Sequence, residues 1–131
     1  MVAGMTPVLQ EGRYLFCSTG DATRIEQCRE RAIGMFREAE GVSFILAAAD
    51  AEAIGFDGAL PMRHIVLQIV SALDGVGLTA AVSAALAERG IPCNMVAAYH
   101  HDHVFVPDTM ADEAVAVLRE LQAGVGRDEP V

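Results

Sequence analysis

A continuous stretch from Ile65 to Pro107 constrains the fold of this chain more than any other. It opens with an apolar, β-branched run over residues 65–70, which predicts a buried strand. Apolar side chains then recur at helical spacing over residues 78–89, and Gly90 follows as a helix-ending residue. The stretch therefore begins as a strand followed by an amphipathic helix.

The second half of this stretch contains two more apolar runs around a polar turn. Residues 93–99 and 103–106 are predicted strands, and residues 100–102 are the tight turn between them. The complete predicted order is strand, helix, strand, hairpin turn and strand.

Other elements are predicted on both sides of this stretch. In chain order they are a short helical turn over Thr6 to Leu9, a strand over residues 13–18, a helix starting at Thr23 and ending between Gly34 and Phe36, a strand over 42–47, a helix over 49–55, and a helix over 110–122 that Gly124 ends. His64, close to the start of a strand, is expected at a surface or a sheet edge.

Four short segments match a known protein family in sequence. They are LDGVGLTAA at residues 73–81, YHHDHVFVP at 99–107, REAEG at 37–41 and YLFC at 14–17. Together they resemble the signature of a family of small stand-alone ACT-domain proteins. The resemblance implies an α+β, ferredoxin-like βαββαβ (ACT-like) fold, with antiparallel sheets and helices on one face. It also implies a strand or extended segment near Phe36 to Glu38, so that the helix from Thr23 would end early, around Gly34.

A faint internal repeat favours two such units. Residues 41–54 and 103–118 each contain an apolar strand followed by an alanine-rich helix with acidic residues. With the resemblance, this pattern predicts tandem or pseudo-duplicated units: an abbreviated N-terminal unit over residues 1–61 and a C-terminal unit over 62–131. ACT modules usually pair with another unit, so a homodimer is expected.

Composition and charge exclude several classes of protein. The net charge of −9 would repel phosphate backbones, which argues against nucleic-acid binding. No apolar run approaches the roughly 20 residues of a membrane span, and the N-terminus lacks a signal-peptide pattern, so a cytoplasmic protein is expected. Cys17, Cys28 and Cys93 lack metal or disulfide spacing and are expected to fill the core.

The glycine-containing turn before the central helix is the first candidate binding site. A helix N-terminus presents free N–H groups and partial positive charge, which suit a ligand carboxylate. In ACT-type sensors this loop commonly holds an amino-acid carboxylate, so the resemblance implies a ligand-binding role for Asp74, Gly75, Gly77, Leu78 and Thr79. The alternative is that the glycines only permit a tight turn and close helix packing.

The second candidate lies on the strand–turn–strand segment. By analogy with arginine-sensing tandem ACT proteins, Tyr99 and Asp102 could address the ammonium and side chain of a ligand. Asn94 could face the same ligand. The alternatives are that Asp102 caps the hairpin and that Asn94 makes an ordinary hydrogen bond at a strand edge.

Three closely spaced histidines also raise the possibility of metal binding. Alternation along an extended chain places His101 and His103 on one face, and His64 could add a third imidazole. No complete metal-ligand pattern accompanies them, and no catalytic or dinucleotide motif is present, so no metal site and no cofactor is expected.

Three function classes follow from these observations. The leading prediction is a non-enzymatic regulatory module that binds a small molecule, an amino acid in particular, at an ACT-type interface. The second is a ligand-free protein–protein interaction or dimerisation module. The third is a histidine-based, metal-dependent enzyme.

Overall fold

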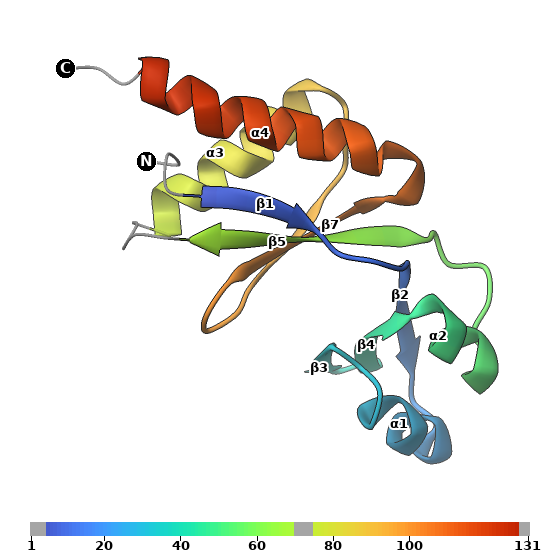
Figure 1. Ribbon diagram of the computed structural model, residues 1–131. Helices are drawn as coiled ribbons and strands as arrows, with labels where there is room; N and C mark the ends of the chain where they lie inside the picture. Colours follow the sequence, from blue (N-terminus) through green and yellow to red (C-terminus); the bar gives the residue numbers. More distant parts are fainter. Residues whose placement is uncertain (1–4, 70–74, 129–131) are drawn as a thin grey trace. The chain divides into compact units, whose positions relative to one another are not determined.

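A computed structural model describes residues 5–69 and 75–128 of the chain (Figure 1). The chain divides into two compact units. Unit 1 combines the N-terminal segment up to Glu11 with everything from Arg63 onward, and unit 2 is the intervening Gly12–Met62. Unit 2 is therefore inserted into unit 1. The division expected from sequence, by contrast, was residues 1–61 and 62–131, with the N-terminal segment in the same unit as residues 12–61.

Unit 2 is a three-stranded antiparallel sheet with two helices. Its elements are β2 (Tyr14–Thr19), α1 (Ala22–Arg29), β3 (Gly34–Glu38), β4 (Gly41–Ala47) and α2 (Ala48–Ile54). Strand β4 lies between β2 and β3. The buried core consists of Leu15, Cys17, Cys28, Phe44, Leu46 and Ala51.

Local sequence explains these elements. In β2, Leu15 and Cys17 are buried and alternate with exposed Phe16, as expected for a strand with one face on a core. Helix α1 starts after Asp21, whose carboxylate accepts a hydrogen bond from the Arg24 backbone N–H at 2.9 Å. At the β3–β4 turn, Gly41 has φ +153°, and an added Cβ would lie 2.9 Å from the Thr19 carbonyl oxygen.

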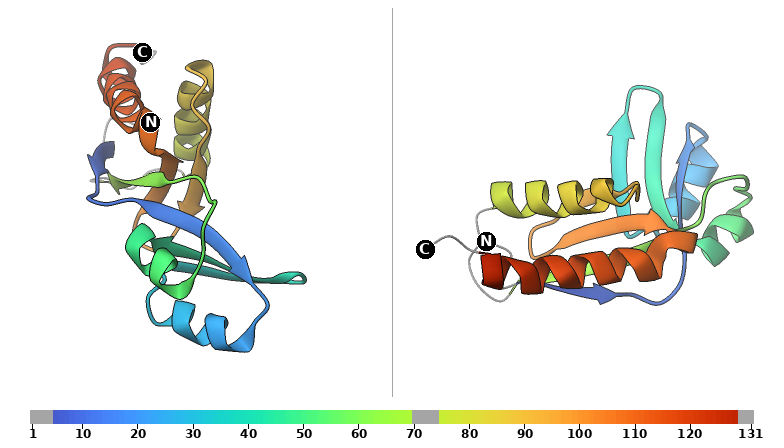
Figure 2. Two further views of the ribbon diagram at one scale, coloured as in Figure 1. Left: turned by 90° about the vertical axis from the view of Figure 1, so that its right-hand side faces the viewer. Right: turned by 90° about the horizontal axis from the view of Figure 1, so that it is seen from above.

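In its described residues, unit 1 is a four-stranded sheet with two α-helices, which lie on one face of the sheet (Figures 1 and 2). Its elements are β1 (Met5–Leu9), β5 (Met62–Ile69, its first residue counted with unit 2), α3 (Gly75–Glu88), β6 (Asn94–Ala97), β7 (Asp102–Pro107), a 3-10 turn (Asp108–Met110) and α4 (Ala111–Asp128). The strand order is β1-β5-β7-β6. The order strand, helix, strand, strand, helix from β5 to α4, completed by β1, confirms the predicted ferredoxin-like α+β fold.

The two faces of this sheet differ in composition. Side chains that point toward the helices form a buried core with Leu78, Val82 and Leu86 of α3 and Ala114 and Leu118 of α4; the strand members are Met5, Ile65, Leu67, Val104 and Val106. Since side chains alternate along a strand, His64, His103 and Phe105 lie on the opposite face. His64 is 8% exposed, so the expectation of a surface or edge position was wrong.

The prediction of a helical turn over Thr6 to Leu9 was also wrong. These residues form β1, which pairs antiparallel with β5 from Met5 opposite Ile69 to Leu9 opposite Ile65. Pro7 has no N–H to donate, and proline is tolerated on an edge strand. Tertiary pairing with β5 therefore overrides the local helix-start signal.

Two predicted helix boundaries differ from those observed. The helix predicted from Thr23 to between Gly34 and Phe36 ends at Arg29, and Gly34–Glu38 is strand β3 paired with β4. This strand contains the extended segment that the family resemblance implies near Phe36 to Glu38. Gly124 does not end the last helix, which continues to Asp128. An isolated glycine inside a helix costs only about 1 kcal/mol relative to alanine, so it does not always end one.

Replacement of Met5 by alanine should test whether β1 belongs to the core of unit 1. Met5 has no exposed surface, so truncation should lower the free energy of unfolding by about 2–5 kcal/mol. Truncation of partly exposed Val8 on the same strand should cost clearly less. Urea denaturation measures both changes, and equal small effects would contradict this placement of β1.

Candidate functional site

The first turn of α3 contains most of the predicted carboxylate-binding residues. Gly75 begins the helix, so Gly77 lies in its first turn rather than in a preceding loop. An added Cβ on Gly77 would meet nothing within 4 Å, which leaves open space beside this turn. Thr79 is exposed, whereas Leu78 is buried in the core of unit 1, so its side chain does not face a ligand at this turn. Asp74 lies outside the described residues.

The β6–β7 hairpin carries the other predicted residues. Asp102 is the half-buried first residue of β7, opposite Ala97, and the turn closes with a 3.0 Å hydrogen bond from Ala98 N–H to the His101 carbonyl. Tyr99 lies in this turn and is 94% exposed. Asn94 is an exposed residue at the start of β6, opposite Phe105.

The fold brings some of these residues to the same end of unit 1 and separates another. The hairpin turn and the start of α3 lie at the same end of the unit 1 sheet (Figures 1 and 2). Asp102 and Tyr99 are therefore at the end where Gly77 and Thr79 lie. Asn94 is at the opposite end of β6, away from the turn. The described contacts include none that joins the α3 turn to the hairpin.

A pair of histidines links β5 and β7 beside Asp102. The Nε2 atom of His64 lies 2.8 Å from the Nδ1 atom of His103, a hydrogen bond in which one ring donates and the other accepts. The two rings stack with centroids 5.0 Å apart, and His64 also stacks on Phe105 at 4.6 Å. A doubly protonated pair could not form this bond, because both facing nitrogens would be donors.

Burial keeps these histidines in their neutral form. Burial, in the first place, and the neighbouring His103, in the second, together lower the pKa of His64 from 6.5 to about 4. The pKa of His103 is also lowered, by burial first and by His101 second, while the Asp102 carboxylate opposes the shift. The Asp102 carboxylate is therefore near enough to His103 to favour the charged form of its imidazole.

From sequence, His64 was placed near His103 only as a possible third metal ligand, and not as its hydrogen-bond partner. Sequence spacing shows which residues share a face of one strand, but not which strands are neighbours. One sequence signal could have placed His64 inside the sheet: an apolar run follows it directly. Because side chains alternate along a strand, His64 then lies on the opposite face of the sheet from Ile65 and Leu67.

Lower pH should destabilise the protein through His64. A histidine with a lowered pKa binds its proton more readily in the unfolded chain, so stability is full above pH 6.5 and falls as pH drops toward about 4. Urea denaturation at several pH values should show this loss, and His64→Gln should reduce its slope. His100→Gln, at an exposed turn position, should keep the wild-type profile. Parallel profiles for wild type and His64→Gln would contradict this assignment.

The described structure also shows how possible metal ligands and the cysteine thiols are placed. In the part of the chain that is described, no group of three or more histidine, cysteine, aspartate or glutamate side chains could hold a metal ion. Cys17 and Cys28 are buried, as predicted for core residues. Burial raises the pKa of these thiols and of Cys93, which disfavours the nucleophilic thiolate.

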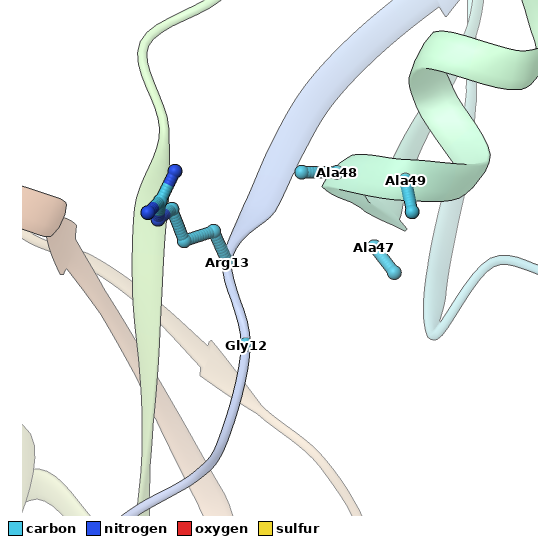
Figure 3. Close-up of a pocket in the computed structure, with 5 residues that line it drawn as sticks. All are labelled: Gly12, Arg13, Ala47, Ala48 and Ala49. Atoms are coloured by element: carbon cyan, nitrogen blue, oxygen red, sulfur yellow. The ribbon is translucent and has the colours of Figure 1, made fainter.

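Unit 2 contains a hollow that the sequence analysis did not anticipate (Figure 3). It has a volume of about 390 Å³ and is lined by Gly12, Arg13, Ala47, Ala48 and Ala49, where β2 and α2 begin. The Ala48 N–H at this point donates to the Arg13 carbonyl at 2.9 Å. None of the predicted site residues lines this hollow, and three of its five lining residues are alanines.

The fold and its candidate site define a class: a ferredoxin-like module with two units in one chain. Two family models, each described as an ACT domain, match the chain, one over residues 60–120 and the other over residues 1–63. The protein belongs to the ACT-domain family. No curated protein matches its sequence. Among the described residues, no helix is both long and apolar enough to cross a membrane.

Solved structures share this fold. A Vibrio cholerae protein of unknown function, described as a possible transport protein, is 36% identical, with a TM-score of 0.82 and 92% of each chain covered. Aspartate kinase from Clostridium acetobutylicum is 11% identical, with a TM-score of 0.68, over 92% of this chain and 34% of the kinase. The regulatory subunit of aspartate kinase from Thermus thermophilus is 14% identical, with a TM-score of 0.63, over 88% of this chain and 96% of the subunit.

Proposed function

We propose that this protein is a non-enzymatic, cytoplasmic regulatory module that binds an amino acid, or a similar small zwitterion, in unit 1. The ligand carboxylate would lie at the first turn of α3, on free backbone N–H groups that include that of Gly77, with Leu78 and the exposed Thr79 next to it. Its ammonium group would lie against Asp102, with Tyr99 beside it. Asp74, Gly75 and Asn94 complete the residues that we propose for ligand binding.

The observation that carries the proposal is that these two places share one end of unit 1 (Figures 1 and 2). Burial of a zwitterion is costly unless both of its charges are paired. The first turn of a 14-residue helix offers donors and partial positive charge, and Asp102 offers negative charge. Open space beside Gly77 supports close approach of a ligand to the backbone. Asn94, at the far end of β6, has the weakest support of the set.

The comparisons support the regulatory part of the proposal. Two of the similar structures are an aspartate kinase and the regulatory subunit of one, and the likeness shows that a fold of this kind occurs in regulated enzymes. We propose the same kind of role here, with a metabolic enzyme as the regulated partner.

Ligand-free protein–protein interaction is the second candidate, because large apolar side chains of β3 are exposed. Phe36 is 72% exposed, and Ile33 and Met35 next to it are exposed as well. Exposed apolar side chains on an edge strand are typical of association sites.

A screen of the common amino acids by thermal shift, followed by calorimetry, tests the leading proposal. A ligand that binds only the folded protein raises its melting temperature, and the rise grows with the logarithm of the ligand concentration above its dissociation constant. Stabilisation by one or a few amino acids is the expected result. If no amino acid or small zwitterion stabilises the protein, the ligand-binding proposal is wrong.

A further inference from the structure

His103 lies where a charge on its ring would act on the proposed ligand site. It follows Asp102 directly on β7, and its Nδ1 atom is hydrogen-bonded to Nε2 of His64 on β5 at 2.8 Å. Val96, the β6 residue opposite His103, is apolar. In the described part of unit 1, the titratable groups that act on His103 are therefore His64, His101 and Asp102.

The His64–His103 pair can take up one proton without losing its hydrogen bond. In the neutral pair, one facing nitrogen donates and the other accepts. When His103 gains a proton, its Nδ1–H donates to the unprotonated Nε2 of His64, and the bond becomes charge-assisted. Only a second proton, on His64, makes both facing nitrogens donors. A positive charge on His103 is therefore compatible with the observed contact between β5 and β7.

The first proton goes to His103 rather than to His64. His64 is only 8% exposed, and burial together with the neighbouring His103 lowers its pKa to about 4. His103 is half-buried; burial and His101 lower its pKa as well, but the Asp102 carboxylate opposes this shift. The charge therefore forms on the ring that is next to Asp102.

Given the ligand site proposed above, on which this inference rests, we propose that protons and the amino acid compete for Asp102, so that acidification releases the ligand. A charged His103 neutralises Asp102 and repels an ammonium group that lies against the same carboxylate. By linkage, a bound ammonium group makes His103 harder to protonate. The site then holds its amino acid near neutral pH and releases it as the pH falls through the range in which His103 gains its proton.

The pH range of this effect identifies the residues that can cause it. Histidine is the side chain that ordinarily changes its charge between about pH 5 and 8, whereas carboxyl groups ordinarily do so nearer pH 4. The chain has four histidines. Two of them form the pair, and the other two, His100 and His101, directly precede β7. His100 is exposed and provides a matched control for His103.

Isothermal titration calorimetry at two pH values tests the competition. The probe is the single common amino acid that raises the melting temperature most in the thermal-shift screen. Its affinity for wild type should be roughly three- to tenfold weaker at about pH 5 than at about pH 7.5, because one unit of pKa shift corresponds to a tenfold change. His103→Gln should bring this ratio close to one, and His100→Gln should keep the wild-type ratio. Circular dichroism should show that each protein is folded at both pH values.

The outcomes separate this inference from the function on which it rests. If no amino acid binds at the higher pH, the ligand site itself is wrong. If an amino acid binds equally well at both pH values, or His103→Gln keeps the full wild-type ratio, the ligand site stands and the competition is overturned.

Nuclear magnetic resonance titration of the histidine rings tests the coupling between His103 and Asp102 directly. The pKa of His103 should be lower in Asp102→Asn than in wild type, and lower in wild type saturated with the amino acid than without it. Asp112→Asn, at an exposed position in the first turn of α4, should leave the pKa of His103 unchanged. Identical titration of His103 in wild type and Asp102→Asn overturns the competition.

Discussion

Replacement of Asp102 by alanine should weaken binding of the stabilising amino acid by roughly 10- to 150-fold. Hydrogen bonds to charged groups contribute about 1.5–3 kcal/mol, and each 1.4 kcal/mol changes affinity tenfold. Asp102 is half-buried at the start of β7, where a contact with an ammonium group is screened less than on an open surface. Isothermal titration calorimetry of wild type and variant measures the ratio of dissociation constants.

Two further variants separate a ligand contact from a structural role. Asp102→Asn keeps the shape and the capacity to accept a hydrogen bond but removes the charge, so it should also bind weakly. Asp112→Ala removes an exposed acidic residue from the first turn of α4 in the same unit and should leave binding unchanged. If Asp102→Ala binds as tightly as wild type, or all three variants lose affinity equally, Asp102 does not contact the ligand.

Replacement of Phe44 by alanine should lower the free energy of unfolding by about 3–5 kcal/mol. Phe44 is 1% exposed, in the core between β4 and the helices of unit 2, and its removal would leave a cavity in a small core. This is a large part of the stability of an ordinary domain, so the variant should be partly unfolded at moderate temperature. Urea denaturation followed by circular dichroism gives the value.

Leu60→Ala is the matched surface control in the same unit. Leu60 is 62% exposed, so its truncation should change stability by no more than about 0.5 kcal/mol. Similar losses for Phe44→Ala and Leu60→Ala would contradict the core described for unit 2.

The strands with a clear alternating or continuous apolar pattern were predictable from sequence. β2, β4, β5 and β7 lie close to their predicted positions, because one or both faces are buried and the pattern records that burial. Helix α2 was predicted to within one residue at each end. The ACT-like fold was predictable because the motifs of the family occur in both halves of the chain.

The elements that were mispredicted depend on partners distant in sequence. Residues 5–9 are a strand only because β5 provides the hydrogen bonds, and Gly34–Glu38 is a strand only because β4 lies beside it. Local propensity favoured helix at both places, and only the family resemblance indicated an extended segment near Phe36 to Glu38; tertiary pairing made both segments strands.

The candidate site was likewise predictable from sequence only in part. From sequence, the helix start at Gly77 and the hairpin at Asp102 could be recognised as places with suitable chemistry. The common end of unit 1 that they share follows from the strand order β1-β5-β7-β6, and so does the contact of His64 with His103.

The sequence by itself determined the fold class, the main strands and helices, and the residue types available for a ligand, since these depend on local periodicity and short motifs. Only the tertiary structure decided that the N-terminal strand completes unit 1, that unit 2 is an insertion, and that a buried histidine pair lies beside Asp102. The physical reason is that pairing between strands depends on which backbone edges and apolar faces can meet in space. That property belongs to the whole chain rather than to any segment of it.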